Sequence, residues 1–200
     1  MKGSMASLPV NTDCKPIILK LPLVNRWAVV HENQFNQLAY HIVDMDSLGY
    51  PGVMNSGEMI LANQTIEVPY EGYPGHHFAG FEDHQNHRSL LYYTWHEPLP
   101  GSSQEYRTHI MSSEFSSIID LQPTSHELET LDGCGYQGGG ELQLSPEARE
   151  LAYYHHKKFI SGFKHRQSYL HVMNLSTDRI SLLEPSNTYA CDTIYGNYGD

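Results

Sequence analysis

Histidines are concentrated in one stretch of this chain, between Pro69 and Pro98. Neutral imidazole nitrogens bind divalent transition metals, and Glu82 or Asp83 can add a carboxylate ligand or orient one of the rings. The stretch therefore predicts a metal site, with metal-free acid–base chemistry and surface decoration as the alternatives. Five of the 13 histidines lie within 21 residues there, namely His76, His77, His84, His87 and His96.

The spacing of these histidines matches no defined metal motif. HExxH, H-x-H and HxD are all absent from the stretch, and a cupin-like barrel would show a tight H-x-H with a following Glu. His84 and His87 can share one turn, whereas His96 and Glu97 end the next expected strand and can fold back near His76 and His77. A divalent transition metal is thus the one cofactor hypothesis that the sequence offers, and its ligands depend on tertiary structure.

Cys134 is the second chemical candidate, because it lies between two glycines. Its surroundings resemble the nucleophile turn of chymotrypsin-like cysteine proteases, where small residues leave the thiolate and the oxyanion-hole amides open. His41 or His31 upstream can act as the base of such a site. The resemblance covers three residues and lacks that family's downstream substrate-pocket histidine, so a tight turn around a buried thiol is the alternative.

Aromatic side chains are the third candidate set, because an aromatic cavity can bind a small apolar ligand or a sugar. The chain has 14 tyrosines and two tryptophans. The side chains expected to line a ligand cavity are Trp27, Tyr92, Tyr93 and Trp95. Packing in a β core is the alternative, since Tyr and Trp are common strand residues.

The elements that must position these groups are short strands. Apolar residues that alternate with polar ones, bounded by Pro, Gly, Asn and Asp, predict strands. Residues 89–95 are apolar on both faces, which predicts a central strand. Strands are expected at 17–21, 26–31, 37–43, 58–62, 65–68, 76–81, 89–95, 105–112, 115–121, 126–131, 141–144, 169–175 and 179–183, with a hairpin between 58–62 and 65–68.

One helix is expected, at 146–161. Ser145 is a good N-cap, Pro146 suits the first helical position, and apolar residues recur at helical spacing from Ala148. Gly162 is a natural end. The sequence thus predicts one mainly β domain over residues 1–200, an antiparallel β-barrel or β-sandwich of about ten short strands with one helix in its second half.

Composition and charge exclude several classes of function. A formal charge of −11 at pH 7 argues against binding to nucleic acid, because such a surface repels phosphates. No apolar run approaches the roughly 20 residues of a membrane span, and the first ten residues lack the apolar segment of a signal peptide. Three cysteines without close spacing form no disulfide framework, which favours the cytoplasm or another reducing compartment.

Three functions are open at this point. The first is a soluble β-barrel protein that binds a small-molecule ligand in an aromatic and histidine-lined cavity, with a divalent metal and catalysis as further hypotheses. The second is a structural or assembly protein, such as a capsid-like β module, that forms a homo-oligomer. In that case an extended arm at 1–16 and a Gly- and Tyr-rich tail at 186–200 are expected to dock. The third is a cysteine hydrolase that uses Cys134.

Overall fold

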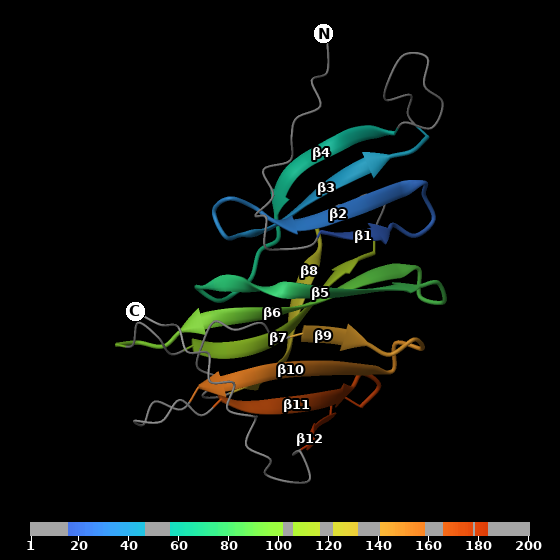
Figure 1. The fold of residues 1–200 in the computed structure, drawn as a ribbon. Coiled ribbons are helices and arrows are strands. Elements are labelled where there is room, and N and C mark those ends of the chain that lie inside the picture. The colour runs from blue at the N-terminus through green and yellow to red at the C-terminus, as the bar shows by residue number, and fades with distance from the viewer. Residues whose placement is uncertain are drawn as a thin grey trace, which may run out of the picture.

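The computed structural model describes residues 16–46, 57–101, 106–116, 122–131, 141–158, 166–177 and 179–183. These residues form twelve strands in three antiparallel sheets of four strands each (Figure 1). No helix in this part of the chain is long and apolar enough to cross a membrane. The arm expected at 1–16, apart from Pro16, and the tail expected at 186–200 lie outside the described residues.

Every sheet is a meander in which each strand pairs with the next one along the chain. The first sheet contains β1 (Ile17–Lys20), β2 (Arg26–Glu32), β3 (Leu38–Asp44) and β4 (Glu58–Thr65). The second contains β5 (Tyr73–Asp83), β6 (Arg88–Pro98), β7 (Tyr106–Phe115) and β8 (Thr124–Leu131). The third contains β9 (Glu141–Leu144), β10 (Glu150–Lys158), β11 (Arg166–Asn174) and β12 (Arg179–Leu183).

Short polar side chains hold the hairpin turns. Between β2 and β3, Asn33 Oδ1 accepts the backbone N–H groups of Phe35 and Gln37, at 2.9 and 3.1 Å. Between β5 and β6, the Asp83 carboxylate accepts the backbone and side-chain N–H groups of Asn86, at 3.1 and 2.7 Å. Asn and Asp favour such turns because their side chains bond to nearby backbone groups, and the turns in turn set the strand register.

The helix expected at 146–161 is wrong. A turn follows Ser145, whose Oγ accepts two backbone N–H groups across it, at 3.1 and 3.0 Å, and strand β10 comes next. Leu151 is buried and Tyr154 is exposed, and β10 pairs with β9 on one side and β11 on the other. Leu151 and Tyr153, two residues apart, are both buried, so this segment carries a strand period as well as a helical one. Pairing with two neighbouring strands decided between the two.

Most of the other expected strands are confirmed, with two differences. The hairpin expected between 58–62 and 65–68 is wrong, since residues 58–65 form one strand, β4, and residues 66–68 are not in a strand. Asn63, with a φ of 52°, lies at an irregular pairing of β4 with β3 and not in a turn. Strand β7 runs on through Phe115, and residues 117–121 of the next expected strand lie outside the described residues.

Two apolar layers hold the three sheets together. The main contacts between sheets join β1 to β5 and β5 to β9, so the sheets fan out from their first strands (Figure 1). Strand β6 is buried on both faces, which confirms the central strand expected at 89–95. The layer between the first two sheets includes Leu19, Val30, Tyr40, Ile42, Leu91, Tyr93, Trp95 and Met111. The second layer includes Ala79, Tyr92, Ile110, Leu142, Leu151, Tyr153 and Met173.

The described sheets do not close into a barrel, so the barrel alternative is wrong for this part of the chain. The sandwich alternative is right in that sheets pack face to face, but they form three layers. Four-stranded meanders whose first strands converge are the pattern of β-propeller blades, of which a closed propeller has about four to eight. The stack therefore has two end faces, the outer faces of the first and third sheets.

Candidate functional site

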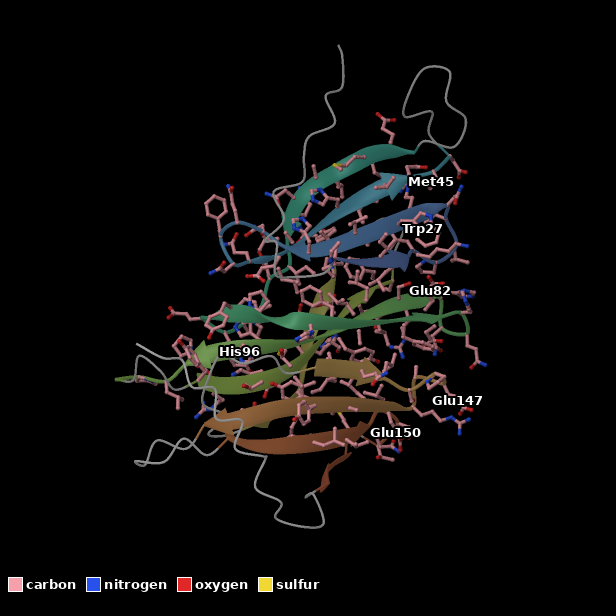
Figure 2. The ribbon with its side chains drawn as sticks, viewed as in Figure 1. Trp27, Met45, Glu82, His96, Glu147 and Glu150 are labelled. Atoms are coloured by element: carbon pink, nitrogen blue, oxygen red, sulfur yellow. The ribbon has the colours of Figure 1, made fainter. Side chains whose placement is uncertain are left out.

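The His-rich stretch forms the β5–β6 hairpin, which separates its histidines. His84 and His87 lie in the turn, where both are exposed. His96 lies near the other end of β6, roughly 30 Å from the turn at about 3.4 Å per residue. Figure 2 shows Glu82 and His96 near opposite ends of the β5–β6 hairpin. The hairpin therefore does not gather the predicted ligands around one point.

At the other end of the hairpin, His96 has a hydrogen-bonding partner on the next strand. His96 Nδ1 lies 3.1 Å from Thr108 Oγ1. The backbone of His76 and His77 lies at an irregular pairing of β5 with β6. Within the described residues, no three His, Cys, Asp or Glu side chains are close enough together to hold a metal ion. The hypothesis of a divalent metal held by the five histidines thus gains no support from the described side chains.

The four aromatics expected around a ligand cavity lie in three places. Tyr93 and Trp95 are buried between the first and second sheets, whereas Tyr92 is buried between the second and third. Trp27 is half-buried on β2, on the face of the first sheet that points away from the second (Figure 2). The first three side chains pack the core, and the fold does not bring all four around one cavity.

Two buried polar atoms on β5 and β6 make no hydrogen bond of ordinary geometry, Trp95 Nε1 and Tyr73 Oη. Gly72 lies against the indole, since a Cβ there would be 3.0 Å from Nε1. Burial, with the Tyr106 hydroxyl nearby, raises the pKa of Tyr73. An unpaired buried donor costs about 1–3 kcal/mol. This end of the second sheet is thus the part of the described core where polar groups are least satisfied.

A buried histidine on β7, His109, forms a polar cluster that the sequence did not reveal. Its side chain is 3% exposed, and its ring stacks on Tyr70 with 3.9 Å between centroids. Nε2 lies 2.9 Å from Glu97 Oε2 on β6, and Nδ1 lies 3.0 Å from Thr130 Oγ1 on β8. The Thr130 hydroxyl donates to Glu127. Strand pairing brings these groups together from segments more than ten residues apart, which no local motif signals.

Hydrogen bonds through His109 join three strands of the second sheet. The Glu97 carboxylate can only accept, so Nε2 of His109 donates to it. On the other side of the ring, Nδ1 contacts the Thr130 hydroxyl, which donates to Glu127. The cluster therefore links β6, β7 and β8.

A second pair of buried histidines lies on the outer face of the first sheet. His31 on β2 and His41 on β3 are 0% and 3% exposed. Their rings stack with 4.7 Å between centroids, and their Nε2 atoms are 2.7 Å apart. The backbone N–H of Asn63 donates to His41 Nδ1 at 3.0 Å, and His31 Nδ1 lies 3.1 Å from the Glu32 carbonyl oxygen. The chain of contacts therefore runs from β4 through both rings to the backbone of β2.

These contacts determine the tautomers of the pair. His41 Nδ1 accepts, so the His41 proton is on Nε2 and is donated to His31 Nε2. His31 then carries its proton on Nδ1 and donates it to the Glu32 carbonyl. Both rings are neutral, and burial, followed by repulsion from His31, lowers the pKa of His41. His41, the base expected for a cysteine site, is thus engaged with His31, while Cys134 lies outside the described residues.

Exposed apolar side chains lie mainly on the first sheet, with one on the third. Ile18 and Met59 are 59% and 44% exposed, and the register places both on the outer face of the first sheet. Tyr154, also exposed, lies on the outer face of the third sheet. In the described part of the chain, the first sheet and its hairpins carry five of the six exposed large hydrophobic residues, Ile18, Leu23, Phe35, Met59 and Ile60.

No protein-family model and no curated protein matches this chain. Among solved structures, it is similar to "a novel alpha-L-arabinofuranosidase (CtGH43) from Clostridium thermocellum ATCC 27405", with 12% sequence identity and a TM-score of 0.39. The match covers 78% of this chain, which spans 46% of the length of that structure. The activity of that enzyme is therefore not carried over to this chain.

Proposed function

We propose that this chain assembles with a second copy of itself through the two end faces of its sheet stack. The observation that supports this proposal is that both faces carry exposed apolar side chains, Ile18 and Met59 on the first sheet and Tyr154 on the third, because exposed apolar surface often marks an interface. The first-sheet end face consists of Ile18, Trp27, Val29, Val43 and Met59. The third-sheet end face consists of Ala152, Tyr154, Leu170 and Val172.

The packing inside one chain supplies the geometry of the proposed interface. The first sheet packs on the second and the second on the third, each time with the first strands next to each other. The third sheet of one copy on the first sheet of the next repeats this step. A head-to-tail interface closes into a ring if the rotation allows it. Two copies would give a ring of six sheets, within the range of about four to eight blades in closed propellers.

Electrostatics opposes this association, and apolar contact must outweigh it. The formal charge of −11 makes two copies repel each other at pH 7. Salt screens charges separated by more than about 8–10 Å at physiological ionic strength, whereas it does not weaken apolar contact. We therefore expect the dimer to become tighter as the salt concentration rises.

The ligand-binding alternative has less support from the arrangement of side chains. Tyr92 and Tyr93, expected to share a cavity, are buried in two different layers of the core. A ligand site would need other residues. Assembly needs only the faces that the stack presents.

Sedimentation velocity at pH 7.5 tests the assembly. The wild-type chain is expected to have twice the mass of one chain. Ile18→Arg or Tyr154→Arg should each weaken association about 100-fold, because an unpaired charge buried at an interface costs about 3 kcal/mol or more. Phe35→Arg, at an exposed apolar residue of the β2–β3 hairpin, is the matched control and should leave the dimer intact.

Mixing the two variants tests the head-to-tail geometry. Each variant carries one intact end face, so a mixture of Ile18→Arg and Tyr154→Arg chains can form one of the two junctions and should recover part of the association. Wild-type chains that stay monomeric at tens of micromolar would refute the proposal. So would a Phe35→Arg variant that dissociates as strongly as Ile18→Arg, because the effect would then not belong to the end face.

A further inference from the structure

The His31–His41 pair lies on the same outer face as the first-sheet end face. Val29 of that face pairs in register with His41. The pair also holds β4, which carries Met59 of the face, because the Asn63 N–H donates to His41 Nδ1. This bond lies where the β3–β4 register is interrupted, between the pairs Tyr40–Gln64 and Ile42–Leu61, so it bridges the gap in the strand pairing. The hydrogen bonds of the pair and the position of the end face are thus linked.

If the neutral pair takes up one more proton, it cannot keep all its hydrogen bonds, whichever nitrogens carry the protons. Four ring nitrogens lie between a donor, the Asn63 N–H, and an acceptor, the Glu32 carbonyl. The neutral pair carries two protons on its four ring nitrogens, so a third proton leaves only one nitrogen bare, that is, without a hydrogen. If His41 Nδ1 is bare, both Nε2 atoms carry hydrogens and face each other at 2.7 Å. If any other nitrogen is bare, His41 Nδ1 carries a hydrogen that faces the Asn63 N–H.

The same directions argue against metal binding by the pair. Ligation through both Nε2 atoms requires two bare nitrogens there. His41 would then carry its proton on Nδ1, against the Asn63 N–H. The pair is therefore arranged to respond to protons.

We propose that protonation of the His31–His41 pair releases β4 and weakens self-association, so that the assembly is controlled by pH. The inference rests on the proposed self-association. Both rings are almost fully buried, so a charge on either lacks water as well as a hydrogen-bond acceptor. The ordinary pKa of histidine is about 6.5. The neutral pair favours the assembled state above that value, and the advantage is lost as the pH falls below it.

Charged groups on the surrounding strands do not offset this effect. Glu32 follows His31 in sequence, and strand alternation points its side chain to the opposite face of β2. Lys20 on β1, on the outer face, adds a positive charge that opposes protonation. Arg26 and Asp44 pair with each other at 2.9 Å at the far ends of β2 and β3. Glu58 on β4 lies at that same far end, where it pairs in register with Asp44.

General charge effects have the opposite sign. Protonation of exposed histidines makes the net charge of −11 less negative and reduces repulsion between copies. Acidification would then strengthen association. Weaker association at low pH is therefore a specific sign of the buried pair.

Sedimentation velocity at pH 7.5 and 5.5, at constant ionic strength, tests the inference. Linkage limits the change to about tenfold in the dissociation constant per pH unit for each linked proton, so we expect an increase of about tenfold between pH 6.5 and 5.5. The double variant His31→Gln/His41→Gln should associate equally at both pH values, because glutamine offers one acceptor and one donor and does not titrate. The control His84→Gln/His87→Gln, in the exposed hairpin, should keep the wild-type response.

Nitrogen NMR of the wild-type rings and hydrogen exchange of the Asn63 amide provide a readout that needs no variant to fold. We expect the Nε2–H tautomer at His41, the Nδ1–H tautomer at His31, and a smaller protection factor for the Asn63 amide below pH 6, once its exchange rate is corrected for the intrinsic effect of pH. Wild-type chains that do not associate at pH 7.5 would refute the proposed function. Chains that associate equally at both pH values, or an Asn63 amide with the same protection factor at both, would refute the pH control.

Discussion

Gly80 on β5 lies where the first sheet approaches the second, and its replacement by alanine tests how the sheets stack. A Cβ at Gly80 would lie 2.3 Å from Leu19 Cδ2 and 2.8 Å from Ile17 Cδ1, both on β1. The φ of Gly80 is not positive, so the backbone accepts alanine. The cost of Gly80→Ala is therefore steric and is located at the contact between β1 and β5.

The expected magnitude follows from two opposing terms. Overpacking a core costs about 1–3 kcal/mol. Replacing a strand glycine with alanine returns about 0.5–1 kcal/mol through lower chain entropy in the unfolded state. Gly80→Ala should thus lower the free energy of unfolding by about 1–2 kcal/mol. Leu19→Ala removes a buried leucine and should cost about 2–5 kcal/mol.

The double variant supplies the sharper test, because the alanine methyl at position 80 can occupy the space that Leu19 leaves. We expect Gly80→Ala/Leu19→Ala to be more stable than the sum of the single effects by about 1 kcal/mol or more. Urea unfolding followed by tryptophan fluorescence measures all four proteins. A neutral Gly80→Ala, or effects that add within about 0.5 kcal/mol, would show that β1 does not pack on β5 at this residue.

Two further predictions concern the second sheet. Hydrogen bonds from Asn86 and then Arg88 lower the pKa of Asp83 from 3.8 to about 2, so its stabilising effect is present above pH 3.8 and is lost as the pH falls toward 2. Asp83→Asn should remove this part of the acid unfolding in melts between pH 2 and 5, and curves that coincide with the wild type would contradict it. His109→Phe should keep the stack on Tyr70 but lower the free energy of unfolding by about 1.5–3 kcal/mol, because the hydrogen bonds of the ring to Glu97 and Thr130 are lost. Unchanged stability in urea would show that the cluster does not join the strands.

Local pattern was sufficient to predict most of the strands. The alternation of apolar residues around Tyr40 and the turn at Asn33 both depend on interactions between residues less than ten positions apart. Strands β2 and β3 accordingly lie within one residue of their expected bounds. The same local rules failed after Ser145. Its hydroxyl accepts backbone N–H groups at a helix start and in a hairpin turn alike, and only the neighbouring strands distinguish the two.

The buried clusters could not be predicted from local pattern. The His-rich stretch predicted a metal site because its histidines are close in sequence. In an extended hairpin, however, the distance along a strand grows by about 3.4 Å per residue, so these side chains end far apart. His109 meets Glu97 and Thr130 through cross-strand pairing, and His31 meets His41 in the same way. Closeness in sequence therefore gave no sign of the His109 cluster, and it assigned His41 the role of base for Cys134.

The sequence by itself determined that this chain forms antiparallel strands with polar turns and a strongly negative charge, because these properties follow from residues near one another or from simple counts. Tertiary structure alone decided that residues 150–158 are a strand, that the sheets stack in three layers, and which histidines meet. Those outcomes depend on which strand edges pair and which apolar faces bury each other, and both are interactions between segments far apart in the chain.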